Sequence, residues 1–470
     1  MFLDATPQSI LVLGDIFLDY TMYGSVEKLA NEAPLPVFRK ERETIRLGGC
    51  GNVVQNLAAL GCEELHVFAA CGHDRKGTLI ESLLKQIRVE PHLLRKEGTD
   101  TISKHRFFCK NKLMFRYDEE ERFSLTESDE AHVIEEVCRI LDSRRIDTIL
   151  FSDYNKGFLT PRICQTVIHF ARERGIFTCV DPKDDFTKYS GCTLFKPNRN
   201  EVQSLFQIPF SLSHVADVHA YIKEKVGCAI SVITLGELGI SAHFESGEYY
   251  SWCDETKEVN DVTGAGDIVN AILAYFYPQG TSKKHCLQLA SHLATMSVQH
   301  VGTYTLTFSD LVNAQKYVFG SKLVTVDVLE RLQRPLVFTN GCFDLVHEGH
   351  LSLLRRCKAL AGSTHDVVVA LNSDTSIQKI KGQTRPIRPQ DARIALLNQI
   401  EQVDWIVVFN EETPVELLRK LHPDLLVKGG DYTLEKVLGR EYVKRVEIVP
   451  ITHPISSTKI LETMQQNTQC

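Results

Sequence analysis

The segment from Val259 to Phe276 places an acidic residue directly after a run of small residues at the start of a predicted helix. Gly264, Ala265 and Gly266 carry no bulk that would keep a phosphate away, so their backbone N–H groups can point at an anion. A carboxylate beside such an anion site is costly unless it accepts a proton from a substrate hydroxyl. Asp267 is therefore a candidate general base for phosphoryl transfer, and a helix-capping aspartate is the alternative.

A second candidate site follows the apolar run that begins at Pro335. There a strand, a glycine turn and a helix start carry His347 and His350. Histidines three residues apart at a helix start lie on one face, so both can address one phosphate group. Zinc is the competing interpretation, but no further Cys or His ligand set accompanies the pair. A capping or core role for either histidine alone is the ordinary alternative.

Further motifs in the first two-thirds of the chain resemble those of the ribokinase-like carbohydrate kinases, in the order of that family. The resemblance covers the Gly264–Asp267 signature, a Gly-Gly-x-x-Asn segment, two aspartates after the first strand, an Asn-x-x-Glu motif and a nucleotide loop. It implies sugar binding by Asp15, Asp19, Gly48, Gly49 and Asn52, organisation of Mg²⁺ by Asn198 and Glu201, and ATP binding by Thr234, Gly236 and Gly239. Taken singly, the two glycines suit a plain turn, and Asn52 and Asp15 suit caps.

The segment around His347 and His350 resembles the His-x-Gly-His motif of the cytidylyltransferase-like superfamily. The resemblance implies attack on the α-phosphate of a nucleoside triphosphate, release of pyrophosphate and no covalent enzyme intermediate. Supporting segments follow in the expected order and imply nucleotide binding by Asn340, Gly341, Phe343, Asn372, Asp374, Lys428, Gly429, Ser456, Ser457 and Thr458. The run from Ser456 to Thr458 also suits a simple helix cap, and Lys428 a solvated lysine before a turn.

The two halves in this order and at these lengths resemble the bifunctional D-glycero-β-D-manno-heptose-7-phosphate kinase/heptose-1-phosphate adenylyltransferases. More particular marks are the segments 28–38, 152–159 and 373–387. The resemblance implies phosphorylation of heptose 7-phosphate at O1, then adenylyl transfer from ATP to heptose 1-phosphate for the lipopolysaccharide core. A separate phosphatase acts between the two steps in that family.

A substrate that arrives as a 7-phosphate needs fixed cations far from its reacting hydroxyl. The candidates are Lys104, Arg106, Arg116 and Lys156, and surface charge is the alternative for each. Three departures from the family leave the domain geometry and the choice of ATP or CTP open. These are the run 455–460, a short linker, and Ser291 with His292 where an Asn-Ala pair is common near the adenine site.

The elements that must position these residues are short β-branched runs, each followed by a small or polar residue and a helical pattern. This rhythm predicts α/β folds with mainly parallel sheets, whose functional groups gather at the carboxyl ends of the strands. We predict a ribokinase-like domain over 1–316, a linker over 317–334 and a Rossmann-like nucleotidyltransferase domain over 335–470. The extended segments 34–46 and 101–116 predict a small β-lid on the first sheet.

Composition narrows the possible partners. The chain has 470 residues and a formal charge of −7, without the clustered basic excess that binding to nucleic acid or an anionic membrane needs. Its 14 cysteines form no C-x-x-C pair, which predicts reduced thiols in a cytosolic protein. Neither a secretory signal nor a membrane-spanning stretch is expected. The predicted cofactor is Mg²⁺ with ATP, the partners are small molecules, and a homodimer through the kinase domain is expected.

Two alternative functions are compatible with the sequence. One is an enzyme of the same two reaction classes that acts on another sugar or polyol phosphate, with CTP possible in the second step. The other is a binding or scaffold protein with decayed enzyme folds. Asp267, His347 and His350 argue against decay, because a decayed site has no chemical need to keep these groups.

Overall fold

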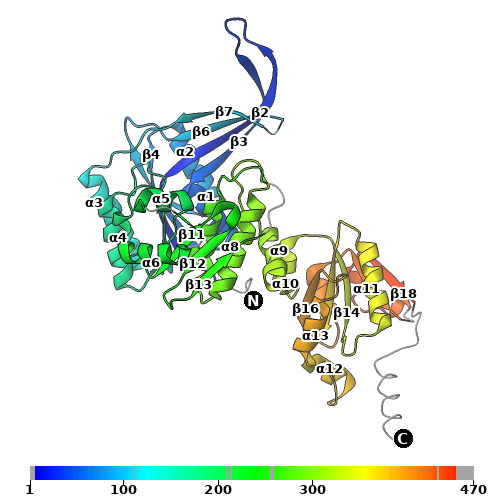
Figure 1. The fold of residues 1–470 in the computed structure, drawn as a ribbon. Helices are drawn as coiled ribbons and strands as arrows, with labels where there is room; N and C mark the ends of the chain where they lie inside the picture. The colour runs from blue at the N-terminus through cyan, green and yellow to red at the C-terminus, as the bar shows by residue number, and fades with distance from the viewer. Residues whose placement is uncertain are drawn as a thin grey trace. The chain divides into compact units, whose positions relative to one another are not determined.

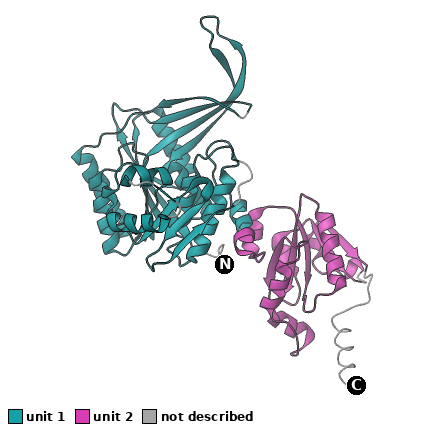
Figure 2. Ribbon diagram, in the orientation of Figure 1, with its two compact units in different colours: residues 1–314 teal, residues 315–470 magenta. Residues whose placement is uncertain are grey.

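The computed structural model describes residues 6–110, 112–207, 210–211, 214–254, 259–430 and 433–450. It divides into two compact units, residues 1–314 and 315–470 (Figure 2). The division falls within helix α9 (Phe308–Phe319). Part of the predicted linker belongs to the second unit, because Leu323 pairs with Ile406 in a parallel bridge. The exact domain bounds stay a prediction.

The first unit is built on a large, mainly parallel sheet. Its strand order within the described residues is β13 (Tyr249–Trp252), β12 (Ile240–His243), β11 (Ile230–Thr234), β10 (Leu194–Phe195), β9 (Phe177–Asp181), β8 (Thr148–Ser152), β1 (Ser9–Gly14), β4 (Glu64–Gly72) and β5 (Glu90–Lys96) (Figure 1). Strands β12 and β13 are antiparallel. Residues 10–13 of β1 are fully buried, as in a strand covered on both faces.

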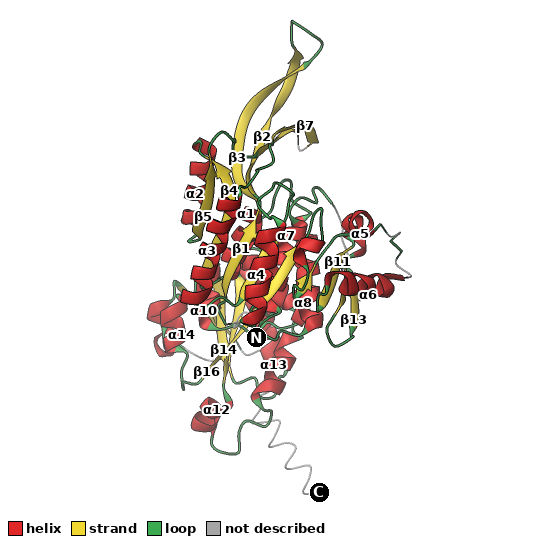
Figure 3. Cartoon of the chain, turned by 90° about the vertical axis from the view of Figure 1, so that its left-hand side faces the viewer, coloured by secondary structure: helices red, strands yellow, loops and turns green. Residues whose placement is uncertain are grey.

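Helices cover this sheet (Figure 3). They are α1 (Cys50–Leu60), α2 (Arg75–Gln86), α3 (Glu127–Ser143), α4 (Pro161–Glu173), α5 (Arg199–Phe206), α6 (Val215–Val226), α7 (Ala265–Phe276), α8 (Lys283–Ser297) and the first part of α9. One core joins Leu11 and Leu13 of β1 to apolar side chains of α3, α4 and α6. The α/β class predicted for this half is confirmed.

The predicted β-lid is a second sheet. Its strand order is β3 (Pro36–Gly49), β2 (Ile16–Leu29), β6 (Ser103–Cys109) and β7 (Lys112–Glu119). The long β2–β3 hairpin projects from the body of the unit, at the blue end of the colour range in Figure 1. Both segments predicted to be extended lie in or beside these strands. The lid is therefore confirmed, and it includes strand β2, which lies outside the two predicted segments.

Helix α7 positions the residues of the first candidate site. Gly264 caps its start with φ 84°, a left-handed conformation that glycine adopts without strain. Every residue from Asp267 to Phe276 is buried, so the helix is apolar nearly all round. Asp267 and Asn270 are the polar exceptions, and both hydrogen-bond to other polar side chains. The predicted loop and helix thus present Asp267 at the first turn of a buried helix, whereas residues 259–262, where a strand end was predicted, form no strand.

The second unit carries a smaller parallel sheet in the order β16 (Trp405–Phe409), β15 (Asp366–Asn372), β14 (Leu336–Gly341), β17 (Leu425–Gly429) and β18 (Arg445–Val449). Its helices in the described part are α10 (Val326–Leu332), α11 (Glu348–Ala361), α12 (Asp374–Lys381), α13 (Gln390–Asn398) and α14 (Val415–Leu421). The chain leaves β14 at Gly341 and enters α11 at Glu348. The two histidines therefore lie at the carboxyl edge of a central strand, as in Rossmann-like folds.

Candidate active sites

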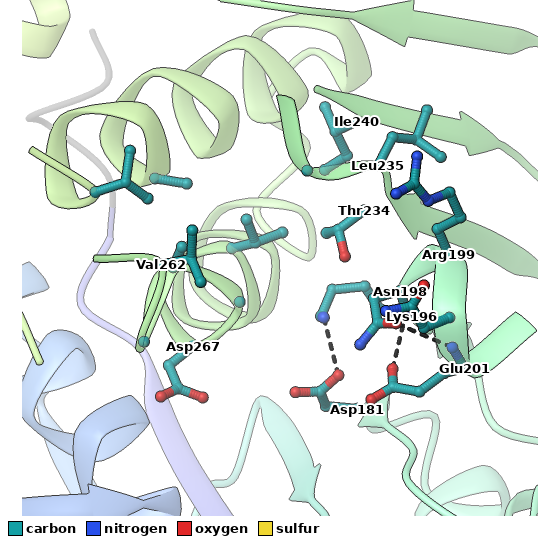
Figure 4. Close-up of a pocket in the computed structure, with 18 of the residues that line it drawn as sticks. Asp181, Lys196, Asn198, Arg199, Glu201, Thr234, Leu235, Ile240, Val262 and Asp267 are labelled. Carbon is teal, nitrogen blue, oxygen red and sulfur yellow. Dashed lines mark hydrogen bonds and ion pairs between the residues drawn. The ribbon is translucent and has the colours of Figure 1, made fainter. Parts of the chain in front are cut away.

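A pocket of about 530 Å³ lies at the carboxyl ends of the strands of the first unit. Figure 4 shows Asp267 on one side of it and Asp181, Lys196 and Glu201 on another. The pocket is also lined by Gly264, Ala265, Gly266, Thr234, Gly236, Gly239, Asn198 and Ser291. The predicted base, small-residue loop, Asn-x-x-Glu motif and nucleotide loop, far apart in the sequence, therefore line one cavity.

Two side chains hold the Asp267 carboxylate. The Asn52 amide donates to its Oδ2 at 2.7 Å, and the Tyr154 hydroxyl donates to its Oδ1 at 2.6 Å. Burial raises the pKa of Asp267 from its ordinary value to about 7, although both hydrogen bonds act in the opposite direction. A buried carboxyl that titrates near neutrality suits a general base better than a cap.

The loop before Asp267 is shaped by close contacts. A methyl group on Gly264 would lie 2.8 Å from the Asn52 amide nitrogen, and the left-handed backbone there would strain any L residue. At Gly266 the nearest atom to such a methyl group would be Lys196 Nζ, at 3.9 Å. The Lys196 ammonium therefore lies close to the small-residue loop, which is the predicted position of a bound anion.

Lys196 and Asp181 were not singled out from the sequence as site residues, yet they stand in the centre of the pocket wall. Lys196 is 2% exposed and pairs with Asp181 at 2.8 Å. Burial alone would lower the pKa of Lys196, but the Asp181 charge outweighs it, so the pKa is raised and the ammonium is kept. The Asn270 amide holds the other Asp181 oxygen at 2.7 Å. The position of Lys196, two residues before Asn198, was the available sequence signal.

Asn198 and Glu201 form a capping box at the start of α5. The Glu201 N–H donates to Asn198 Oδ1 at 2.9 Å, and the Asn198 N–H donates to Glu201 Oε2 at 2.8 Å. Burial and the neighbouring Asp181 charge raise the pKa of Glu201. Both residues also line the pocket. Asn198 and Glu201 therefore cap the helix and also face the cavity. Their predicted role in organising Mg²⁺ stays a prediction.

Asp19 and Asp15, both predicted to bind sugar, have different hydrogen-bond partners. Asp19 Oδ1 accepts from Arg106 at 2.6 Å, and Asp19 Oδ2 accepts from the Thr303 hydroxyl at 3.2 Å. Thr303 also lies beside Gly264, since a methyl group there would meet its Cγ2 at 3.2 Å. Asp19 and Arg106 are therefore linked through Thr303 to the loop that precedes Asp267.

Asp15 belongs to a different setting. Its carboxylate accepts backbone N–H groups from Tyr154, Lys156 and Phe158, at 2.9, 2.9 and 3.2 Å. Burial raises the pKa of Asp15 to about 6, and the nearby Asp153 charge adds to the effect. These contacts assign Asp15 to a loop rather than to a free substrate-facing position, and its predicted sugar contact is untested.

Gly48 and Gly49 make room for other site residues. A methyl group on Gly48 would lie 2.6 Å from Asp19 Oδ2, and one on Gly49 would collide with the Asp15 carbonyl oxygen. Gly49, at φ 61°, immediately precedes α1, which carries Asn52. These close contacts account for glycine at both positions, and the turn at Gly49 brings Asn52 to Asp267. The predicted sugar binding by the two glycines stays a prediction.

The residues predicted to bind the 7-phosphate do not all lie together in the structure. Lys104 Nζ lies 4.3 Å above the Phe17 ring and 3.8 Å from Glu120, which also pairs with Lys156. Burial and then the Lys156 charge lower the pKa of Lys104, so the two ammonium groups face a common region. Arg116 is half-exposed and pairs with Asp118 at 2.7 Å. Lys104 and Lys156 thus lie near the same carboxylate, that of Glu120, whereas Arg116 pairs with Asp118.

In the second unit the two histidines lie against each other. The His347 and His350 ring centroids are 4.0 Å apart, and the Phe343 ring packs 4.9 Å from His350. Burial, helped by His347 and Lys381, lowers the pKa of His350 to about 4. Burial also lowers the pKa of His347, whose Nδ1 is buried without a hydrogen-bond partner in the described part of the chain. The lowered pKa of each ring favours the neutral imidazole, which can donate one N–H.

Other predicted nucleotide-binding residues surround this pair. Lys428 Nζ donates to Asn340 Oδ1 between the neighbouring strands β17 and β14, and burial lowers the pKa of Lys428 to about 8. A methyl group on Gly341 would lie 3.1 Å from Phe343. Gly429 packs beside Leu353 of α11. Ser456, Ser457 and Thr458 lie outside the described residues.

Asn372 and Asp374 are tied together by an arginine that sequence analysis did not single out. Arg393, fully buried, donates to the carbonyls of Cys342 and Asn372 at 2.8 and 2.7 Å and to Asp374 Oδ1 at 2.6 Å. Asp344, also not singled out, accepts from Arg385 and from the N–H groups of Ile387 and Arg388. Both residues fix the loop after β14 on segments distant in the sequence.

Three further findings concern metal binding, membrane spans and cysteines. Within the described ranges, no group of three or more His, Cys, Asp or Glu side chains is arranged to hold a metal ion. The same part of the chain contains no helix with both the length and the apolar character needed to cross a membrane. All 13 cysteines described there are free thiols.

Comparisons with known proteins match both halves of the chain. The model of pfkB family carbohydrate kinases matches residues 7–309, and that of cytidylyltransferase-like proteins matches 338–463. The bifunctional protein HldE of Campylobacter fetus subsp. fetus is 37% identical over 463 residues, which cover 96% of this chain and 98% of the relative. HldE of Nitratiruptor sp. is 35% identical over 471 residues, covering 97% and 99%.

Solved structures support the fold of the first unit. Phosphofructokinase-2 from Escherichia coli in complex with potassium has a TM-score of 0.56 at 16% identity, covering 67% of this chain and 100% of that one. The fold, the sites and the two family models define a carbohydrate kinase joined to a nucleotidyltransferase. Because the relatives match almost end to end, the chain belongs to the family of HldE bifunctional proteins.

Proposed function

We propose that the chain carries out two ATP-dependent steps of ADP-heptose synthesis. The first phosphorylates D-glycero-β-D-manno-heptose 7-phosphate at O1 to the 1,7-bisphosphate. The second transfers an adenylyl group from ATP to heptose 1-phosphate, with release of pyrophosphate. The observation that carries the proposal is the end-to-end match to HldE proteins, together with Asp267 in the kinase pocket and the histidine pair in the second unit. Family membership favours this prediction over another sugar or CTP.

In the kinase step Asp267 takes the proton of the sugar O1 hydroxyl as that oxygen attacks the γ-phosphorus. The bond from phosphorus to the ADP oxygen breaks, and the negative charge spreads over the phosphoryl oxygens. The amides of residues 264–266 and the Lys196 ammonium face that charge, which a fixed arrangement of donors stabilises without reorganisation. Thr234, Gly236 and Gly239 would hold the nucleotide along the far wall of the pocket.

Mg²⁺ accompanies ATP in this proposal. The pocket offers carboxylate and amide oxygens from Asp181, Asn198 and Glu201, which are ligand types that Mg²⁺ prefers. The Asp181 charge that raises the pKa of Glu201 would also be relieved by a cation. When bound, the ion would supply positive charge that offsets the charge of the phosphate oxygens. The donor set fits an ion held largely through water and ATP rather than a closed protein cage.

Lys104 and Lys156 are proposed to bind the 7-phosphate. Replacing both with methionine should raise the KM for heptose 7-phosphate about 10²- to 10⁴-fold, since each of the two charged contacts to an anion is worth on the order of 1.5–3 kcal/mol. The expected effect on kcat is small, because the reacting O1 lies at the other end of the sugar. Steady-state kinetics of ADP release would measure both constants.

A matched control is available on the lid sheet that carries Lys104. Lys40→Met removes an exposed lysine that pairs with Glu43 and should leave the KM unchanged. Heptose without its 7-phosphate should be used equally poorly by the wild type and the double variant. A double variant with an unaltered KM for the 7-phosphate would remove these lysines from the substrate site.

In the transferase step an oxygen of heptose 1-phosphate attacks the α-phosphorus of ATP, and pyrophosphate leaves. His347 and His350 would donate hydrogen bonds to the α-phosphate, and Lys428 would add positive charge near Asn340. Neutral histidines serve as donors without a proton-transfer step, in agreement with the lowered pKa of each ring. No covalent enzyme intermediate is expected.

We also expect a cytosolic homodimer through the kinase domain. The supporting observation is an apolar surface on the lid strand β7, where Leu113, Met114, Phe115 and Tyr117 are about half-exposed. Exposed apolar clusters of this kind are typical of interaction surfaces. Light scattering of the full chain would measure the molar mass against the 53.1 kDa of one copy.

The reaction itself can be tested directly. The purified chain with heptose 7-phosphate, ATP and Mg²⁺ should give a phosphorus NMR signal for a new anomeric phosphate and one equivalent of ADP. With heptose 1-phosphate it should give ADP-heptose and pyrophosphate from ATP, and far less product from CTP. The absence of both products with active substrates would contradict the proposal, and equal use of CTP would revise the second step.

A further inference from the structure

The short loop after β8 brings a tyrosine onto the proposed base. The Tyr154 hydroxyl donates to Asp267 Oδ1 at 2.6 Å, and Tyr154 lines the same pocket. Asn52 holds the other carboxylate oxygen at 2.7 Å. Each oxygen of Asp267 therefore has one fixed donor, while further lone pairs stay available for a substrate hydroxyl.

The backbone of this loop is gathered by a buried carboxylate. Asp15 accepts the N–H groups of Tyr154, Lys156 and Phe158, which are alternate residues of a tight turn. Asn155 and Gly157 take positive φ angles of 57° and 100°. A methyl group on Gly157 would collide with the Phe123 carbonyl oxygen, so the loop also packs closely on its neighbour. The path of the chain on both sides of Tyr154 is thereby fixed.

A second carboxylate holds the start of the loop. Asp153 accepts the Asn155 N–H at 2.8 Å, accepts the Tyr189 hydroxyl at 2.7 Å and pairs with Lys188 at 2.7 Å. The Phe17 ring meets the Tyr154 ring edge-on, with centroids 5.5 Å apart. Tyr154 therefore has little freedom to leave Asp267, and its hydroxyl position is set by the protein before any substrate binds.

We propose that Tyr154 is a positioning residue for the kinase reaction, which fixes the orientation of the Asp267 carboxylate through a loop anchored on Asp15. The proposal rests on the proposed function, in which Asp267 is the base. During the reaction the O1–H bond breaks and its proton passes to Asp267, while Tyr154 keeps its own proton. Tyr154 thus acts through Asp267, and Asp15 acts through Tyr154.

The hydrogen bond also affects the charge state of the base. The titratable groups facing Asp267 are Tyr154, Asp181, Lys196 and Cys50. Burial raises the pKa of Asp267 to about 7, and the Tyr154 hydroxyl is one of the contacts that oppose this rise. Loss of the hydroxyl should therefore raise the pKa further. Since the base must be ionised to accept a proton, the rate at neutral pH should fall and the pH profile should move upward.

The test is Tyr154→Phe in the full chain. We expect the kinase kcat at pH 7 to fall about 10- to 100-fold, as loss of a hydrogen bond to a charged group does, with KM values little changed. The ascending limb of kcat/KM against pH should move to higher pH, so that part of the activity returns at alkaline pH. A tyrosine that only supports the fold would lower activity without moving this limb.

Tyr277→Phe is the matched control, because it removes a tyrosine hydroxyl of the same unit that donates to a carboxylate, Glu245, outside the pocket. It should cost similar stability in a thermal melt and leave the ascending limb in place. Should Tyr154→Phe fail to fold, 3-fluorotyrosine at position 154 keeps the hydroxyl and makes it a stronger donor. That substitution should move the limb to lower pH.

Failure of this proposal can be told apart from failure of the proposed function. If Asp267→Asn retains kinase activity, the base assignment itself is wrong. If Asp267→Asn is inactive while Tyr154→Phe keeps the wild-type kcat and pH profile, only the role of Tyr154 is overturned. In the Asp267→Asn background, Tyr154→Phe should have no further effect on the residual rate, and an additional full loss would contradict action through Asp267.

Discussion

Asp267→Asn should lower kinase turnover by roughly 10²–10⁴-fold, the range typical for loss of a general base. The change keeps the size of the side chain and its place in the pocket, but an amide cannot accept the O1 proton. The amide oxygen could still accept from Asn52, and the amide NH2 could donate to the Tyr154 hydroxyl, which would then act as the acceptor. Release of ADP in the presence of heptose 7-phosphate measures the loss, and adenylyl transfer by the same preparation should be unchanged.

A thermal melt of the Asp267→Asn variant distinguishes loss of the base from unfolding of the protein. The pKa of Asp267 is raised to about 7 in the folded chain, above its ordinary value, so the buried charge opposes folding as pH rises through that range. The amide in the Asp267→Asn variant carries no charge, and the variant should melt no lower than the wild type at pH 8. Asp217→Asn, which changes an exposed aspartate in the first turn of α6, is the control and should leave turnover intact. Near-normal kinase turnover in Asp267→Asn would overturn the assignment of the base.

The local parts of both sites were predictable because their information is contiguous in the sequence. The Gly264–Asp267 loop is followed at once by the apolar helix α7, and His347 and His350 begin α11. The strands could be predicted in the same way, since residues such as Ile10 to Leu13 form unbroken apolar runs that suit a buried parallel sheet. Each of these signals depends on neighbouring residues only.

Contacts between distant segments could not be predicted in this way. Tyr154, Asn52 and Asp267 lie on three different parts of the chain, and Arg393 reaches the loop after β14 from α13. Asp15 looks like a substrate ligand in the sequence because it ends a strand. Only the fold brings three backbone N–H groups onto its carboxylate. A pattern of residue types specifies which groups are available, whereas their partners depend on how the strands are ordered.

His350→Ala should reduce adenylyl transfer by about 10²-fold or more, since it removes a preorganised donor to the α-phosphate in a partly buried site. His350 lies 4.0 Å from His347 between ring centroids, so the remaining histidine can supply only part of the stabilisation. Pyrophosphate release from ATP with heptose 1-phosphate measures the effect. His365→Ala is the control, because this partly exposed histidine contacts its neighbour Thr364 after the same helix. It should leave the transferase rate unchanged.

Kinase activity should be unaffected by His350→Ala, because each unit contains a complete set of candidate residues. The contacts of residues 315–334 indicate how this independence can be tested with fragments. Lys316 lies 3.6 Å above the Trp405 ring, and Leu323 pairs with Ile406, so a transferase fragment should begin at Gln315. A fragment ending at Ala314 should phosphorylate heptose 7-phosphate, and the complementary one should release pyrophosphate, provided that each folds alone. Two soluble, folded fragments that are both inactive, beside an active full chain, would show that the units share an active site.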